Sequence, residues 1–423
     1  MLEELYYEGT GSISLFDKPY RAYVILRPNS GDIVVKVQHN RINGWKFLKK
    51  VREGEFFGRE YKLENLEIVT PLGKLCKKSL GLYPVLVNPG PSSIFDSYVL
   101  KIAYSSHAGI ATLVFRPKDS FLVFESQTTF SSEDENYYEL LFLGFRPKIL
   151  PSISLTLDSN FRLFMQAGKE NKNSSSGKEF TNFQGDFVLV RSNLDLFESS
   201  KRDDLCKVLS LLNGGKVSLA LGYALRENEF KVAFSFPTDI CTVLGGVGNP
   251  FRTESSEEYL ELVETFVKTY FSYVGSLKEE EKRRFNLFVE YFIEGISMNT
   301  ILESKLITLY TALEIMDDSD TLTKDSLKKA YELDEDKATF FKELRNKIVH
   351  NGLSVREAVE KIPNYVRDKS RGRRNLDTSF LGKEKDWACY FFLICMLYKK
   401  LLYRIGADDL TKKLGFDLCV VAS

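Results

Sequence analysis

The hydrophobic residues of this chain change their spacing near residue 250, and this change constrains what each part can fold into. Before it, apolar residues alternate with other residues or form short β-branched and aromatic runs, which is typical of strands. After it, apolar residues recur every three to four positions, which is typical of helices that pack on one face. The sequence therefore predicts a two-part α+β protein.

Residues 1–245 are predicted to form a β-rich, antiparallel, sandwich-like module. Its clearest hairpin has large apolar residues at alternate positions over 217–223 and 230–236, with a turn at Glu227-Asn228. One helix, over 205–212 and stopped by Gly214-Gly215, is predicted to interrupt the strands. The other predicted strands are 21–26, 33–37, 98–103, 112–115, 121–124, 139–145 and 187–191.

Residues 246–255 are predicted to be a linker, because a Gly-rich run followed by a proline has little to pack and stops a helix. Residues 256–423 are predicted to be an all-α domain. The segment from Ile301 to Met316 is apolar on most sides and should be a central helix. The predicted helices are 256–274, 278–296, 299–317, 322–332, 335–350, 353–362 and 380–405.

The chain has 58 basic and 58 acidic residues, which excludes a uniformly basic nucleic-acid binder but not a local basic patch. The helical half is uneven: 256–340 has 10 basic and 19 acidic residues, and 341–423 has 17 basic and 10 acidic ones. The basic excess is densest over 367–374, which has no apolar periodicity and is predicted to be a loop. This loop is either a solvated surface or a contact for the phosphate backbone of a nucleic acid.

Six cysteines are spread along the chain without a Cys-x-x-Cys pair, so neither a zinc ribbon nor a thioredoxin-like site is predicted and the thiols should be free. The first five residues lack the basic and apolar pattern of a signal peptide. The most apolar run, 387–398, is shorter than the roughly 20 residues that a membrane span needs and should be a buried helix. We therefore expect a cytoplasmic protein with no membrane partner.

Only three histidines are present, and one of them stands out. His39 and His107 fall in predicted loops and are expected to be structural. His350 ends the helix predicted over 335–350, where apolar residues recur at i, i+3 and i+7. Asn351-Gly352 directly after it predicts a left-handed helix stop.

Two polar residues of the same helix are placed near His350. Asn346 precedes His350 by four residues and shares its face of the helix. Arg345 is about 140° round the helix from His350, but its side chain is long enough to converge on a shared ligand. Arginine matches phosphate oxygens, and histidine can take or give a proton near neutral pH. This set suits phosphodiester cleavage in RNA, where the 2′-hydroxyl is the nucleophile and no metal is required. A lone Arg-x4-His pattern is weak evidence, since a histidine before Asn-Gly can simply cap a helix.

The segment RNKIVHNG, with Arg345, Asn346 and His350, resembles the signature of the HEPN (higher eukaryotes and prokaryotes nucleotide-binding) superfamily. That signature is an arginine and a polar residue, then a histidine at the end of a helix. The preceding apolar helix with Leu313-Glu314 and the later helix over 387–402 resemble helices of the HEPN bundle. The layout of a β-rich module before this bundle resembles, more narrowly, the ApeA-type antiphage (abortive infection) proteins.

The resemblance implies a metal-independent endoribonuclease without a cofactor. Arg345 would bind and polarise the scissile phosphate, His350 would act as general base or acid, and Asn346 would position one of them. Glu314 would support the site without touching RNA, or is simply an exposed helix carboxylate. The residues expected to bind RNA are Lys347, Lys369, Arg371, Arg373 and Arg374.

The resemblance also implies partners: RNA (tRNA, mRNA or phage RNA), a second copy through the helical domain with the two motifs facing each other, and a phage protein as a possible trigger. Single-stranded loops are expected to be preferred to duplex RNA. Two alternatives stay open. The helical domain could be a non-catalytic dimerisation or binding module with a ligand-sensing β domain, or the β module could carry the activity. A phosphate-loop enzyme is not predicted, because no Lys-Ser/Thr follows 245–248.

Overall fold

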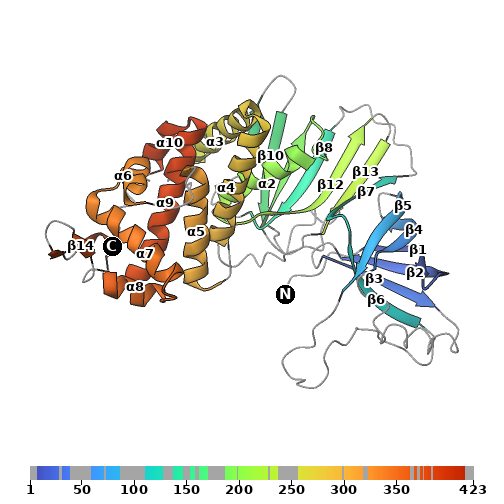
Figure 1. The fold of residues 1–423 in the computed structure, drawn as a ribbon. Coiled ribbons are helices and arrows are strands. Elements are labelled where there is room, and N and C mark those ends of the chain that lie inside the picture. Colours follow the sequence, from blue (N-terminus) through green and yellow to red (C-terminus); the bar gives the residue numbers. More distant parts are fainter. Residues whose placement is uncertain are drawn as a thin grey trace, which may run out of the picture. The chain divides into compact units, whose positions relative to one another are not determined.

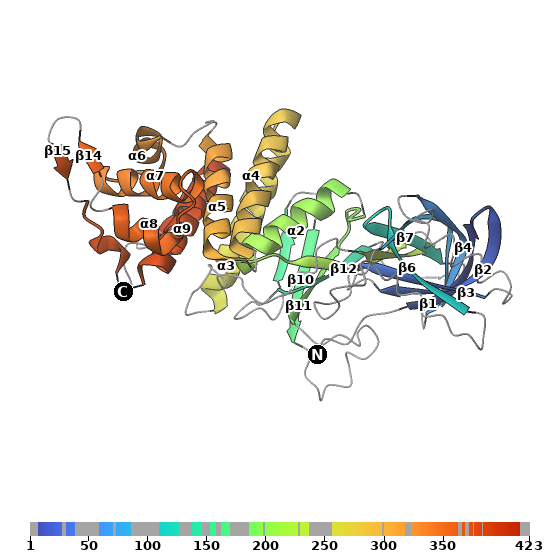
Figure 2. The same ribbon diagram turned by 60° about the horizontal axis from the view of Figure 1, so that its bottom comes forward.

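The computed structural model describes most of the chain and divides it into two compact units (Figures 1 and 2). The first unit comprises Met1–Gly144, Asp158–Arg202 and Ser218–Cys241; the second comprises Phe145–Leu157, Asp203–Val217 and Thr242–Ser423. The described residues are 7–27, 31–38, 59–70, 73–85, 110–126, 137–145, 153–157, 162–169, 186–197, 199–226, 229–236, 256–297, 300–317, 323–362, 366–368, 372–374, 376–382 and 384–414.

The first unit is built from antiparallel strands in one continuous hydrogen-bonded order, β4-β1-β2-β3-β6-β5-β7-β13-β12-β8-β11-β10. In chain order the strands are β1 (Tyr7–Leu15), β2 (Lys18–Arg27), β3 (Asp32–Gln38), β4 (Tyr61–Thr70), β5 (Gly73–Pro84), β6 (Ile110–Pro117), β7 (Phe121–Ser126), β8 (Tyr137–Leu143), β10 (Arg162–Lys169), β11 (Asp186–Ser192), β12 (Ser218–Arg226) and β13 (Glu229–Ser235).

The predicted sandwich-like arrangement is wrong in one respect, because part of this sheet closes on itself. β4 pairs with β5 as well as with β1, so β1 to β6 form a closed ring. β5 is 12 residues long and serves two further neighbours: Leu75 and Cys76 pair with β7, while Leu82–Pro84 pairs with β6. One long strand therefore joins the ring to the open run that starts at β7, in place of two separate sheets.

Alternation along the strands builds the core of this unit. In β2, Ala22, Val24 and Leu26 point inward and are fully buried, while the residues between them are more exposed. The same pattern in the neighbouring strands produces one apolar cluster that runs from Ile13 in β1 to Phe236 after β13. The ring and the strands next to it thus share a core.

The second unit is helical. Its helices are α2 (Ser199–Asn213, from Asp203 on), α3 (Ser256–Ser276), α4 (Glu279–Ser297), α5 (Leu302–Asp317), α6 (Lys324–Tyr331), α7 (Glu335–Val349), α8 (Val355–Lys361), the 3-10 turn η3 (Ser379–Leu381), α9 (Lys385–Ile405) and α10 (Asp408–Lys413). It also holds β9 (Ile153–Thr156) and the short hairpin β14 (Val366–Asp368) and β15 (Gly372–Arg374).

Two helices organise this unit. α9 packs against α3, α5, α8 and α10, and α5 packs against α4, α7 and α9 (Figure 1). The Phe341 ring stacks on Phe392 at 4.7 Å, and the hydroxyl of Tyr390 donates to the Gly295 carbonyl oxygen at 3.1 Å. The expectation that residues 301–316 form a central helix is confirmed, as is the buried helix over 387–398, which is part of α9.

The other predictions divide by location. The strands over 21–26, 33–37, 112–115, 121–124 and 187–191, the late hairpin and the seven helices of the second half are confirmed. The predicted loop over 367–374 is wrong, because a short antiparallel hairpin forms there, with Val366 opposite Arg374. The predicted strand 98–103, the linker 246–255, His39 and His107 lie outside the described residues.

Candidate functional site at the end of α7

Helix α7 carries the signature residues, and its two ends are defined by local hydrogen bonds. The Asp334 carboxylate accepts the backbone N–H of Lys337 at 2.8 Å and caps the start of the helix. At the other end, His350 is the C-cap, and its N–H donates to the Asn346 carbonyl at 2.9 Å. Gly352 has φ of +64°, the left-handed conformation that the sequence predicted as a helix stop. These contacts leave His350 exposed at the very end of α7.

Arg345 is held in place by a carboxylate on α5. Its Nη2 atom lies 2.5 Å from Oε1 of Glu314, and the two side chains are only 16% and 18% exposed. The contact is an ion pair and not a well-aligned hydrogen bond, because no donor reaches Oε1 of Glu314 with hydrogen-bond geometry. Glu314 is therefore not the exposed carboxylate of the simpler expectation. The structure brings the predicted supporting residue and the predicted phosphate ligand together.

A second polar contact, one turn earlier on both helices, fixes the α5–α7 pair. The buried hydroxyl of Tyr310 donates to the Phe341 carbonyl oxygen at 2.9 Å. Burial raises the pKa of Tyr310 well above its usual value, and the nearby Arg345 cation opposes this rise. Tyr310 therefore stays a neutral donor. The sequence did not single it out, because a tyrosine within an apolar helix gives no sign of its partner.

The chain after His350 is also tied to α5. Ser354 caps α8 in a reciprocal capping box with Glu357, and the Glu303 carboxylate accepts the N–H of Val355 at 2.9 Å. Glu303 was another residue that sequence reasoning missed, since an acid in the first turn of a helix usually needs no further explanation. The turn that carries His350 is thus anchored on both sides.

The remaining predicted residues are placed unevenly. Asn346 and Lys347 are half-buried on α7, next to Arg345. Arg373 and Arg374 belong to β15, of which only the backbone is described, and Lys369 and Arg371 lie outside the described residues. The structure thus pairs Arg345 with Glu314 near the end of α7 that also carries Asn346 and His350, and the side chains of the basic segment lie outside what it describes.

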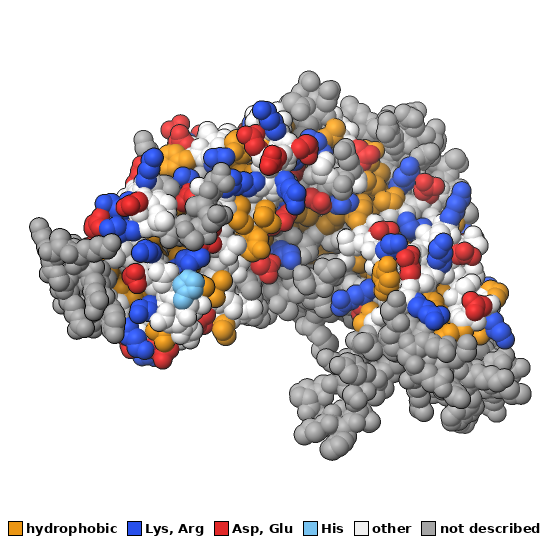
Figure 3. Space-filling view, viewed as in Figure 1, with side chains coloured by type: hydrophobic (Ala, Val, Ile, Leu, Met, Phe, Trp, Pro, Cys, Tyr) orange, Lys and Arg blue, Asp and Glu red, His pale blue; other side chains and the backbone are white. Residues whose placement is uncertain are grey.

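The side chains at this end can serve acid–base chemistry on an anion. Arg345 supplies a permanent positive charge at a fixed position, and His350 is open to solvent at the helix end. On the face drawn in Figure 3, basic and acidic side chains are interspersed over the helical unit. A ligand would therefore have to recognise a local arrangement of charges.

The remaining candidates for special chemistry are clusters of metal-binding side chains and the cysteine thiols. Within the described ranges, no group of three or more His, Cys, Asp or Glu side chains comes together as a metal site would. Cys76, Cys206 and Cys389 form no disulfide, and burial raises the pKa of the Cys389 thiol. Cys395 is disulfide-bonded, so the expectation of free thiols throughout is wrong at that position.

Comparison with known proteins gives no relative: no family model, no curated protein and no solved structure matches this chain. Among the helices that the structure describes, none combines the length and the apolar character needed to cross a membrane.

Proposed function

We propose that the helical unit is a HEPN-type, metal-independent endoribonuclease, and that the whole chain acts in antiphage defence by abortive infection. The observation that supports this proposal most is the pairing of Arg345 with Glu314 next to an exposed His350. A half-buried arginine fixed by a carboxylate is a preorganised phosphate ligand, and a solvent-open imidazole one turn on can move a proton.

In the proposed reaction the ribose 2′-oxygen attacks phosphorus and the bond from phosphorus to the 5′-oxygen breaks. One base takes the proton of the 2′-hydroxyl, and one acid gives a proton to the leaving 5′-oxygen, so the products are a 2′,3′-cyclic phosphate and a 5′-hydroxyl. Arg345 would stabilise the charge on the phosphoryl oxygens, with Asn346 as a positioning residue. A single His350 cannot easily be base and acid in one step, which favours a homodimer that brings two copies together.

The other parts of the chain have proposed roles that depend on this reaction. Lys347 and the basic segment with Lys369, Arg371, Arg373 and Arg374 would contact the RNA backbone. The β-rich unit would be the sensor or regulatory part, with a phage protein as its possible trigger and tRNA or mRNA as the target of the activated enzyme. The protein would work in the cytoplasm.

One observation favours a second candidate function. The guanidinium of Arg345 is already neutralised by Glu314 and is 16% exposed, as a purely structural arginine would be. In this alternative the helical unit is a non-catalytic HEPN module for dimerisation or partner binding, and the β-rich unit senses a ligand.

The test is cleavage of single-stranded RNA in EDTA by the parent chain and by three variants. His350→Ala removes an exposed side chain, and Arg345→Ala combined with Glu314→Gln avoids an unpaired carboxylate. Arg356→Ala, at an exposed position of α8, is the control. The proposal expects cleavage by the parent and the control and at least 100-fold slower cleavage by the other two, which is the scale of lost acid–base catalysis. Folding and oligomeric state are checked first. No cleavage by the parent, or equal cleavage by all four, would favour the non-catalytic candidate.

A further inference from the structure

A second site in the helical unit lies away from the signature residues. It is a cavity of about 870 Å³ between α4, the end of α5, α6 and α9, within the range of small-molecule sites. Its basic lining residues are Lys278, Arg284, Lys329, Lys400 and Arg404. Its acidic ones are Glu280, Glu281 and Asp317. The cations outnumber the carboxylates because Lys400 and Arg404 come from the basic segment 341–423.

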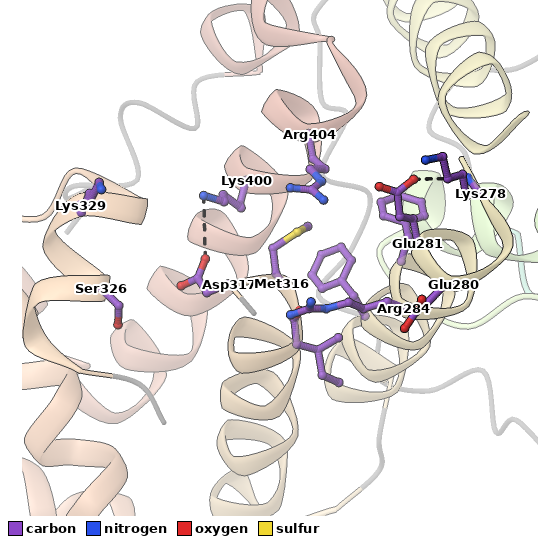
Figure 4. Close-up of a pocket in the computed structure, with 13 residues that line it drawn as sticks. Lys278, Glu280, Glu281, Arg284, Met316, Asp317, Ser326, Lys329, Lys400 and Arg404 are labelled. Atoms are coloured by element: carbon purple, nitrogen blue, oxygen red, sulfur yellow. Dashed lines mark hydrogen bonds and ion pairs between the residues drawn. The ribbon is translucent and has the colours of Figure 1, made fainter. Parts of the chain in front are cut away.

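Three of the cations lie near the end of α5. Figure 4 shows the guanidinium groups of Arg284 and Arg404 on either side of Met316 and the amine of Lys400 pointing toward Asp317. Arg284 donates through Nε to the Ile315 carbonyl oxygen at 3.0 Å, and Arg404 donates through Nε to the Tyr273 hydroxyl at 2.8 Å. These bonds orient both guanidinium groups, which lowers the entropic cost of binding an anion there.

Asp317 positions the lysine of this group. Its side chain is 6% exposed and its Oδ1 lies 3.8 Å from Nζ of Lys400. Tyr331 lies beside this carboxylate, but neither its hydroxyl nor Oδ2 of Asp317 makes a well-formed hydrogen bond to a described residue. Burial raises the pKa of Asp317, while Lys400 lowers it. The Asp317 carboxylate is therefore buried in the wall of the cavity and does not fill it. Its role is to orient Lys400.

The remaining acids leave the cationic part accessible. The Glu281 carboxylate accepts the backbone N–H of Lys278 at 3.3 Å, and Figure 4 shows this pair on the side away from Lys400. Glu280 lies on the same turn of α4. The two acids thus border the cavity at one edge, and the amine of Lys400 and the guanidinium groups of Arg284 and Arg404 lie elsewhere in its lining.

The apolar lining decides what kind of anion would fit. Ile315 and Met316 are half-buried at the end of α5, with the buried rings of Phe285 and Phe288 behind. A bare phosphate would use the cations and leave this wall and most of the volume unused. We propose that the cavity binds a phosphorylated organic molecule of about nucleotide size, with its phosphates on Arg284, Lys400 and Arg404 and its apolar part against Ile315 and Met316. This proposal does not depend on ribonuclease activity.

The test is isothermal titration calorimetry of the full chain in EDTA, with ATP as the probe. Tripolyphosphate and adenosine are titrated separately because each carries one half of the proposed recognition. Arg404→Gln and Lys400→Gln are the test variants, and Arg356→Gln, an exposed arginine of α8 outside the cavity, is the matched control. Thermal melts establish that the variants are folded. Arg404 is exposed, so its variant should fold even if the loss of Lys400 beside Asp317 is not tolerated.

The proposal expects ATP to bind with a Kd of about 10–100 µM, and both test variants to bind at least tenfold more weakly. The control should bind like the parent, and adenosine and tripolyphosphate each at least threefold more weakly than ATP. No binding of ATP up to millimolar concentration, or equal binding by Arg404→Gln, would overturn the site. Tripolyphosphate binding as tight as that of ATP would overturn the organic part and leave only an anion site. Displacement of tripolyphosphate by a short RNA, without ATP binding, would make the cavity part of an RNA path and contradict the proposal.

Discussion

Arg345 and Glu314 come from different helices, and each gives the other a counter-charge at a position with little access to water. Removing one partner of such a pair leaves a charge that is neither solvated nor paired. The pair is therefore expected to contribute to the free energy of unfolding as well as to function.

The variant Glu314→Ala tests how much the pair contributes to stability. Because Arg345 is 16% exposed, we expect the free energy of unfolding to fall by about 2 kcal/mol, less than for a fully buried pair. Urea unfolding measures it, with Glu360→Ala as the control, since Glu360 and Arg356 form a pair that is 69% and 79% exposed. The control should show no measurable change. An equal effect of both variants would mean that Glu314 does not hold Arg345.

The site residues that the sequence could indicate are those that share one helix. Arg345, Asn346 and His350 follow from spacing and from the Asn-Gly stop. The contact between Glu314 and Arg345 depends on how α5 packs on α7, and periodicity alone does not determine that packing. Tyr310 and Glu303 act through backbone atoms of distant residues, which no local pattern encodes.

At the scale of elements, helices were predictable and several strands were not, for physical reasons. β1 contains Gly9 and Gly11, where a side chain would collide with β4: a Cβ on Gly9 would lie 2.3 Å from the Glu67 carbonyl oxygen. The glycines suggest a turn in sequence but permit close strand approach in the ring. In β4 a bulge at Asn65, with φ of +52°, shifts the buried positions and hides the alternation.

The left-handed conformation of Gly352 after α7 can be tested by comparing two glycines that both have open space around them. Gly352 has positive φ, so Gly352→Ala should lower the free energy of unfolding by about 1 kcal/mol. Gly275, within α3, has no such φ, so Gly275→Ala should raise it by about 0.5 kcal/mol. Urea unfolding of both variants gives the signs. Two effects of the same sign would contradict the left-handed cap at Gly352.

The junction of α6 and α7 predicts a pH dependence. Hydrogen bonds from Lys324 and then Lys328 lower the pKa of Glu335 from 4.5 to about 2. Since the folded pKa lies below the unfolded one, this stabilisation is present above pH 4.5 and is lost as the pH falls toward 2. Thermal melts of the parent should therefore lose more stability over this interval than those of Glu335→Gln. Because the carboxylate is exposed, 1 M salt should reduce the difference. Identical pH profiles would show that these ion pairs contribute nothing.

At the scale of the whole molecule, the proposed reaction favours a homodimer in which two copies of the end of α7 meet. Val349 is 41% exposed beside His350, and an interface there would bury it. Sedimentation velocity should show a dimer for the parent, dissociation for Val349→Asp, and a retained dimer for Leu287→Asp on α4, a position of similar exposure. A monomeric parent, or dissociation by the α4 variant alone, would argue against a dimer through α7.

The proposed metal-independent ribonuclease site at the end of α7 can be tested through the chemistry of the RNA cut. A single-stranded RNA is incubated with the protein in EDTA, and the same RNA is prepared with a 2′-O-methyl group at the cleaved nucleotide. The proposal predicts a 2′,3′-cyclic phosphate and a 5′-hydroxyl from the first, and no cleavage at the modified nucleotide in the second. Cleavage that persists there, leaves a 5′-phosphate, or is as fast with His350→Ala would contradict it.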